Sequence, residues 1–266
     1  MQKLLVFTDI HFVKEGRDII GLDPVARFSQ GLAHALATHP DASHVIITGD
    51  LAHYGSSKEY ARLRAALADC PIPVAMTIGN HDIRAKFRAA FPEAPVDENG
   101  FVQTVIDAHG YRLILLDTAD EEAEIQHSGL LCEARLSWLE DRLTEASDTP
   151  TILFMHHPPI LTGFDGMDHI GLRNRAELIQ WLRAHQQVKQ IVAGHVHRTI
   201  SGSAGGIPTA IFKSPCHQMP MSLGDDDHHV SIDEPGAYGM VLLQDDQIIV
   251  HTEDFTLNPL PPASAI

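Results

Sequence analysis

Short apolar runs bounded by turn residues recur along this chain and alternate with longer segments of helical period. The runs predict buried β-strands at Lys3–Thr8, His44–Thr48, Val74–Ile78, Thr104–Ile106, Tyr111–Leu116, Thr151–Met155, Gln190–Ala193, Thr199–Ser201, Pro208–Phe212, Gly239–Leu243 and Ile248–Thr252. The helical-period segments predict helices at Pro24–Thr38, Ser57–Leu67, Ile83–Ala90, Glu133–Glu145 and Arg173–Ala184. Strands and helices alternate until the last third turns β-rich, which favours an α/β sandwich around a pair of sheets.

The chain contains no internal repeat or low-complexity linker, so we expect one domain over residues 1–257. Ser214–Gly236 lacks periodicity and is rich in Pro, Met, His and Asp, which predicts a long loop or lid near the functional site. The tail over residues 258–266 contains Pro259, Pro261 and Pro262, which exclude a regular helix.

The charge balance narrows the choice of partners. The 266 residues include only 19 Lys and Arg against 35 Asp and Glu, a formal net charge of -16. Phosphate-backbone binding needs clustered basic residues, so we expect neither nucleic acid nor an anionic membrane as a partner. Cys70, Cys132 and Cys216 lie far apart, as expected for reduced thiols, and the N-terminus has no signal-peptide pattern. These features predict a cytoplasmic protein.

Five of the predicted strands end in turns that carry metal-ligand side chains. The strings are LLVFTDIH, VIITGDLAH, VAMTIGNHD, TILFMHHPP and QIVAGHVH. Loops at the carboxyl ends of strands converge on one crevice in open α/β sheets, so we expect these side chains to meet. They are Asp9, His11, Asp50, Asn80, His81, His156, His195 and His197.

The ligand types predict two divalent cations. Imidazole, carboxylate and amide donors together suit Mn²⁺, Fe²⁺, Co²⁺ or Zn²⁺ better than Mg²⁺ or Ca²⁺, which prefer oxygen. No cysteine lies in these turns, which disfavours a structural zinc site. The pairs Asp9/His11 and His195/His197 are spaced i, i+2, so on an extended segment both members would face the same way.

The ordered set D-x-H, G-D, G-N-H-D, H-H and G-H-x-H resembles the calcineurin-like metallophosphoesterase superfamily. The chain length, the string Met155–Pro159 and the pair His217-Gln218 resemble one branch of it, the class III cyclic nucleotide phosphodiesterases and bacterial glycerophosphodiesterases. The resemblance implies a four-layer α/β/β/α sandwich. It also implies seven metal ligands: Asp9, His11 and His197 for the first metal, Asn80, His156 and His195 for the second, and Asp50 as the bridge.

The same resemblance implies three substrate contacts. His81 would stand beside the phosphate without binding metal, and Asn80 would face the substrate as well. His217 matches a histidine that reaches the substrate in the glycerophosphodiesterase-like relatives. Asp50, as the bridge, and His81 are therefore the expected catalytic residues. His81 either protonates the leaving oxygen or only binds a phosphoryl oxygen.

The expected activity is hydrolysis of small soluble phosphodiesters by a metal-bridging hydroxide. We expect 3',5'-cyclic nucleotides such as cAMP, cleaved to 5'-monophosphates, as the substrates. A glycerophosphodiesterase, or a broad phosphodiesterase that also cleaves 2',3'-cyclic nucleotides, is the alternative, and a non-catalytic scaffold is the alternative from another class. The resemblance also implies that the chain forms a homo-oligomer.

Several residues allow two interpretations. His53 stands where relatives often carry Asp or Asn, and His157 either orients a ligand or caps a loop. Asp225–Asp227 with His228 and His229 is either a third metal site or, with its mutually repelling carboxylates, a solvated loop. Histidines without a surrounding motif are expected to be ordinary polar residues, and Trp138 and Trp181 to be core. The histidines without a motif are His34, His39, His109, His127, His185 and His251.

Overall fold

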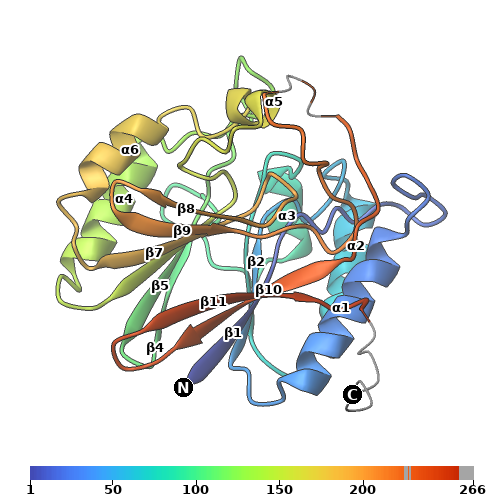
Figure 1. Ribbon diagram of the computed structural model, residues 1–266, viewed down its shortest axis with the longest axis horizontal. Coiled ribbons are helices and arrows are strands. Elements are labelled where there is room, and N and C mark those ends of the chain that lie inside the picture. The colour runs from blue at the N-terminus through green and yellow to red at the C-terminus, as the bar shows by residue number, and fades with distance from the viewer. Residues whose placement is uncertain (225–226, 228, 258–266) are drawn as a thin grey trace, which may run out of the picture.

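The computed structural model describes residues 1–224, 227 and 229–257 and shows two sheets between two layers of helices (Figure 1). The strands are β1 (Gln2–Phe7), β2 (His44–Thr48), β3 (Val74–Thr77), β4 (Thr104–Ala108), β5 (Tyr111–Leu116), β6 (Thr151–Met155), β7 (Val188–Ala193), β8 (Ile200–Ala204), β9 (Ile207–Ile211), β10 (Ala237–Leu243) and β11 (Ile248–Asp254). The helices are α1 (Pro24–Thr38), α2 (Ser57–Leu67), α3 (Arg84–Ala90), α4 (Glu133–Thr144), α5 (Asp165–His169) and α6 (Arg175–Leu182).

One sheet has the order β11-β10-β1-β2-β3 and the other the order β4-β5-β6-β7-β9-β8. Strands β1, β2 and β3 are parallel to one another, as are β5, β6, β7 and β9. Helices α1, α2 and α3 cover the first sheet, and α4, α5 and α6 cover the second (Figure 1). The predicted four-layer α/β/β/α sandwich is confirmed.

The alternation along β1 shows how this strand serves two cores. Leu4 and Val6 face the second sheet, in a cluster that also holds Phe154. Leu5 and Phe7 face the helices and pack with residues such as Phe28 of α1. Because successive side chains point to opposite faces, a strand buried on both sides reads as a continuous apolar run.

The sequence predicted several element boundaries to the residue and missed one helix. Helix α1 begins where Asp23 accepts a hydrogen bond of 2.9 Å from the Val25 amide, and Pro24 occupies the first turn. Glu59 accepts from the Ser56 amide at 2.9 Å, which starts α2 as expected. Helix α5 was not predicted, because five residues are too few to show a helical period. The helix expected at 173–184 is shortened to α6.

Trp138 of α4 is buried in the cluster between the second sheet and its helices, as predicted for a core residue, whereas Trp181 of α6 is only partly buried against the same cluster. Among the described residues, no helix combines the length and apolarity that crossing a bilayer requires. The proline-rich tail over residues 258–266 lies outside the described residues, so its predicted lack of helix is not tested. Asp225, Asp226 and His228 of the acidic run also lie outside them.

Candidate metal centre

The seven predicted ligands come from the carboxyl ends of five parallel strands in two sheets, and the fold brings all of them to one place. Strands β1, β2 and β3 deliver the ligands of the first sheet, and β6 and β7 deliver those of the second. The two carboxylates are buried, with exposed fractions of 0% for Asp9 and 2% for Asp50. The convergence that the sequence predicted at the strand ends is present in the structure.

The backbone of these turns is unusual. Asp9, His11, Asp50, His195 and His197 all have positive φ, between 44° and 73°. Non-glycine residues seldom adopt this left-handed conformation, and where they do the surrounding structure must hold them in it. The assumption that the i, i+2 pairs lie on extended segments was therefore wrong. Each pair reaches the site through a tight turn.

Small residues make these turns fit together. A Cβ atom on Gly194 would lie 1.8 Å from Thr8 Oγ1 and 2.7 Å from Asp9 Oδ2. A Cβ atom on Gly79 would lie 2.2 Å from Asp50 Oδ1. Both distances are far below any van der Waals contact, so these two glycines allow the two sheets' turns to approach.

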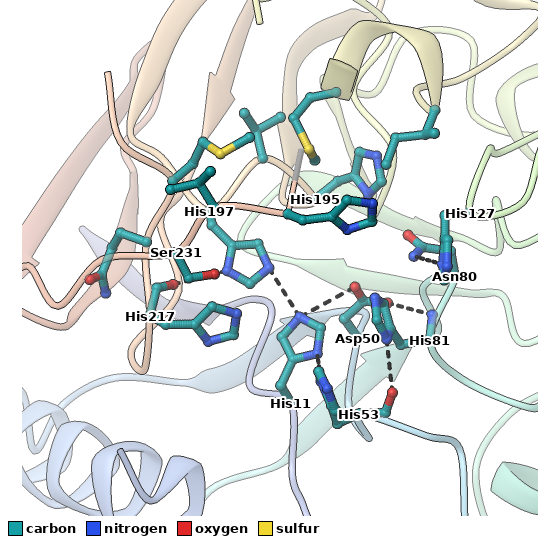
Figure 2. Close-up of a pocket in the computed structure, with 17 residues that line it drawn as sticks. His11, Asp50, His53, Asn80, His81, His127, His195, His197, His217 and Ser231 are labelled. Atoms are coloured by element: carbon teal, nitrogen blue, oxygen red, sulfur yellow. Dashed lines mark hydrogen bonds and ion pairs between the residues drawn. The ribbon is translucent and has the colours of Figure 1, made fainter. Parts of the chain in front are cut away.

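The first group of donor atoms surrounds His11. Its Nε2 lies 3.0 Å from His197 Nε2 and 3.5 Å from Asp50 Oδ2, as the dashed lines of Figure 2 show. Asp9 Oδ1 lies 3.4 Å from the same nitrogen of His197. Asp9 is held in place by the backbone amide of His195, which donates to both of its carboxylate oxygens at 3.0 and 3.1 Å.

The second group surrounds His156. Its Nε2 lies 3.1 Å from Asn80 Oδ1 and 3.3 Å from both His195 Nδ1 and Asp50 Oδ2. Asp50 Oδ2 therefore borders both groups, while Asp50 Oδ1 accepts a hydrogen bond from the His81 amide at 2.9 Å. Two donor groups that share one carboxylate oxygen match the arrangement expected of a dinuclear site.

Two ring orientations show that these groups suit cations. His156 Nδ1 donates to the Thr48 carbonyl at 3.0 Å, and His197 Nδ1 donates to the His217 carbonyl at 2.9 Å. In the neutral rings, the lone pair is then on Nε2, the atom that faces the other acceptors. Facing lone pairs and carboxylate oxygens repel one another unless a cation lies between them, so the donor set fits divalent metal ions.

Burial and mutual contacts shift the pKa values of the cluster. Burial lowers the pKa of His11 and of His195 well below the ordinary value, and burial raises the pKa of Asp9. Burial alone would raise the pKa of Asp50, but His156 and His81 hold it well below the ordinary value. Burial would likewise lower the pKa of His156, yet the Asp50 and Asp9 carboxylates raise it to about 9. The Asp50 carboxylate and the His156 ring therefore stabilise each other's charged forms.

Three imidazole rings form one side of the cavity, here called the histidine wall (His53, His81 and His127). His81 stacks on His53 at 5.3 Å and on His127 at 5.0 Å between ring centroids. His81 Nδ1 donates to the His53 carbonyl at 2.8 Å, which leaves Nε2 as the free nitrogen of that ring (Figure 2). The predicted position of His81, beside the metal ligands without being among them, agrees with this geometry.

Sequence reasoning missed the part played by His127. Its Nδ1 lies 3.0 Å from Asn80 Nδ2, so it accepts a hydrogen bond that turns the Asn80 oxygen toward His156. His127 also has a positive φ of 69°, like the predicted ligands. The prediction that it is an ordinary polar residue was wrong. No local motif surrounds it, so only the fold could reveal it.

His53 and His157 both support neighbours in the site. His53 Nδ1 lies 3.2 Å from His11 Nδ1, so His53 supports a ligand ring in place of the expected Asp or Asn. His157 bonds to Thr118 Oγ1 at 2.8 Å and to the His127 carbonyl at 3.1 Å. Burial lowers the pKa of His157 to about 3, which keeps this ring neutral. His157 therefore holds the backbone of His127, and its role in orienting a ligand stays a prediction.

His217 approaches the first donor group from the Ser214–Gly236 segment. Its ring centroid lies 4.4 Å from that of His197, and it is 6% exposed. Its buried Nδ1 has no hydrogen-bond partner among the described residues, and burial lowers its pKa to about 2. A neutral nitrogen without a partner beside the donor atoms is available to a ligand.

A cavity of about 190 Å³ opens over these donor groups. Its lining includes the histidine wall, His217, and parts of the Ser214–Gly236 segment such as Met219 and Ser231. Figure 2 shows the labelled side chains of several loops pointing into this common space.

Comparisons with known proteins agree with the geometry. A model of the calcineurin-like phosphoesterase family matches residues 2–199. A probable cyclic nucleotide phosphodiesterase of Rhodopseudomonas palustris is 42% identical over 95% of this chain and 92% of its own. A probable glycerophosphodiester phosphodiesterase of Arcobacter nitrofigilis is 30% identical over 83% of this chain and 81% of its own. The solved dimetal phosphatase from Danio rerio superposes with a TM-score of 0.73 at 15% identity, covering 94% of this chain and 95% of that one.

Proposed function

The chain belongs to the calcineurin-like phosphoesterase family, and from this premise we propose that it hydrolyses small phosphodiesters, 3',5'-cyclic nucleotides first among them. The resemblance read from the ligand turns, including its branch, is confirmed by the family match and the relatives. The enzyme is a phosphoric diester hydrolase with a dinuclear metal centre. The observation that carries the proposal is that two groups of donor atoms meet at Asp50 Oδ2.

We assign Asp9, His11 and His197 to one cation, Asn80, His156 and His195 to the other, and Asp50 to both. The donor mixture favours Mn²⁺, Fe²⁺, Co²⁺ or Zn²⁺. When bound, two such ions polarise the phosphoryl oxygens and activate water for attack on phosphorus. Asn80 supplies a neutral oxygen, so the ligands do not cancel the positive charge that the phosphate needs.

We assign the leaving-group proton to His81 in its imidazolium form, in which Nδ1 and Nε2 each carry a proton and Nε2 gives up its own. Its Nδ1 is tied to the His53 carbonyl, so only Nε2 can meet the substrate. Stacking between His53 and His127 holds the ring plane, which aims this nitrogen into the cavity. A positioned donor of this kind contributes roughly 10²–10⁴-fold to the rate. His217, on another side of the same cavity, is assigned to substrate binding.

Cyclic nucleotides come first because the relative with 42% identity over 95% of this chain carries that name. The glycerophosphodiesterase relative supports the alternative, at lower identity. The excess of 35 acidic over 19 basic residues argues against nucleic acid and anionic membranes as partners. We also propose a cytoplasmic location and a homo-oligomeric state. We propose further that residues 1–257 form a single domain in which Ser214–Gly236 acts as a lid.

The test is a panel of esters offered to purified protein loaded with Mn²⁺. The panel contains 3',5'-cyclic AMP, 2',3'-cyclic AMP, glycerophosphoethanolamine, a nitrophenyl diester and a nitrophenyl monoester. We expect cyclic AMP to lead and all turnover to vanish in Asp50→Ala and Asn80→Ala. If another diester leads, the substrate assignment is wrong. If no ester is cleaved and the protein holds far fewer than two ions per chain, the chain is a scaffold.

A further inference from the structure

The cavity has two chemically different sides. The histidine wall bounds one, and five apolar side chains, here called the apolar wall, contribute to the other: Met167, Ile170, Val196, Met219 and Val230. Met167 and Met219 line the same cavity as His53, His195 and His197. A substrate phosphate at the donor groups would thus have an apolar surface on one flank.

Two segments carry four of the five residues of the apolar wall, Val196 lies in the turn after β7, and hydrogen bonds fix both segments. Asp168 of α5 accepts from the Thr162 amide at 2.8 Å and from the Gly163 amide at 3.0 Å, which folds α5 back over the sheet edge. The Gly224 amide donates to the Gly163 carbonyl at 2.9 Å and joins the Ser214–Gly236 segment to α5. The Met219 amide donates to the carbonyl of the ligand His197 at 3.3 Å. The wall is therefore positioned relative to the donor groups.

The burial of the wall changes from its base to its mouth. Met167, Ile170 and Met219 belong to the apolar cluster under α4 and α6, so the core of this layer ends at the cavity surface. Val230, at the mouth, is 43% exposed. An apolar substituent laid along this surface releases water from it, and the flexible thioethers adapt their shape to a flat ring.

Both polar atoms of the Gln218 side chain, next to Met219, already form hydrogen bonds. The Gln218 amide donates to the Ser214 carbonyl at 2.9 Å, and its oxygen accepts from the Glu234 amide at 2.8 Å. Among the described residues that line the cavity, Asp50 is the sole carboxylate and none is Lys or Arg. Asp50 is engaged with the His81 amide and His156. Among the described lining residues, no Lys or Arg and no carboxylate other than that of Asp50 is therefore present to pair with a charged substituent.

We infer that the apolar wall binds the flat, uncharged substituent of the diester, such as a nucleobase, and that Met167 and Met219 determine this specificity. The inference rests on the proposed diesterase function and names the residues behind its substrate preference. A glycerophosphodiester with an ammonium head group gains nothing from this surface. Its charge would instead have to give up water against apolar side chains.

The experiment compares Met167→Gln and Met219→Gln with the wild type. Each change keeps the length of the side chain and adds a polar end. We expect the ratio of kcat/KM for cyclic AMP to that for glycerophosphoethanolamine to fall about tenfold, mainly through KM. Binding of 5'-AMP, measured by calorimetry, should weaken by about the same factor relative to glycerol 3-phosphate. Thermal unfolding and metal content verify that each variant is folded and loaded.

Two further variants complete the design. Met167→Leu keeps an apolar side chain and should keep the wild-type ratio. Met221→Gln makes the same chemical change on the same segment, at a residue that is 66% exposed and outside the cavity lining, and should also keep it. Unchanged ratios in Met167→Gln and Met219→Gln, with an active wild type, would overturn the inference and leave the proposed diesterase function standing. A wild type inactive on every diester would instead overturn the proposed function and this inference with it.

Discussion

The carboxylate of Asp82 accepts a hydrogen bond of 3.0 Å from the backbone amide of Leu51, thirty-one residues earlier in the chain. The same carboxylate also accepts from the Ala52 amide at 3.1 Å and the Gly79 amide at 2.9 Å. One buried side chain therefore ties the turn that follows Asp50 to the turn that precedes Asn80. The two ligands are held together by a residue that binds neither of the donor groups.

We expect Asp82→Asn to destabilise the fold and loosen the second donor group. An amide NH₂ group would face backbone donors that now meet an oxygen, and each unmet buried donor costs about 1–3 kcal/mol. Differential scanning calorimetry and metal titration should show a lower Tm and weaker binding of the second ion. Tyr60→Phe is the comparison, because it removes the hydroxyl that donates to Asp82 at 3.0 Å and accepts from the Ile83 amide at 2.9 Å but leaves the Asp82 carboxylate and its three backbone donors in place. Equal Tm values for Asp82→Asn and wild type would contradict the expectation.

Gly194→Ala should displace Asp9. The added Cβ would lie 1.8 Å from Thr8 Oγ1, so the turn after β7 must move away from the turn after β1. We expect a loss of about 1–3 kcal/mol in the free energy of unfolding and less than two bound ions per chain. Gly171→Ala is the matched control, since its nearest contact would be an ordinary 3.4 Å. Full metal content in Gly194→Ala would show that the close approach is unimportant.

His127→Ala should weaken metal binding, although His127 is not itself a proposed ligand. Without its Nδ1, the Asn80 amide loses the partner that turns its oxygen toward His156. Losing such an orienting partner typically costs about 10–100-fold in metal affinity. Competition titration with a chelating dye measures this directly. His109→Ala is the control, because His109 also has a positive φ, of 50°, but lies in the exposed turn between β4 and β5. Similar losses in both variants would mean that backbone conformation, not the contact with Asn80, is responsible.

Metal removal should lower thermal stability. Asp9 and Asp50 are buried, and in the metal-free protein only neighbouring histidines offset their charge. An ion that binds the folded chain alone adds about 2.7 kcal/mol when its free concentration is one hundred times Kd. Dialysis against EDTA should lower the Tm, and Mn²⁺ or Zn²⁺ should restore it, with Asp50→Ala showing no such response. If EDTA removed all metal and the Tm did not change, the assignment of the ligands would be contradicted.

The sequence alone determined the strands and most of the helices, and it indicated the seven residues that we propose as ligands. Helices α1 and α2 and strands β2, β5 and β6 begin and end where the apolar pattern predicted. These features are local: an apolar run, a capping residue or a ligand-bearing turn is written in neighbouring positions. The ligand turns were recognisable because each follows a strand directly.

Only the tertiary structure decided how the site is assembled. Contacts such as Asp82 to Leu51, or His127 to Asn80, join residues that no local pattern connects. The same holds for α5, which contributes Met167 to the apolar wall and is preceded by Gly163, whose carbonyl accepts a hydrogen bond from the distant Gly224 amide. The positive φ of the ligand turns likewise depends on the tertiary structure, since a strained backbone persists only where its surroundings hold it.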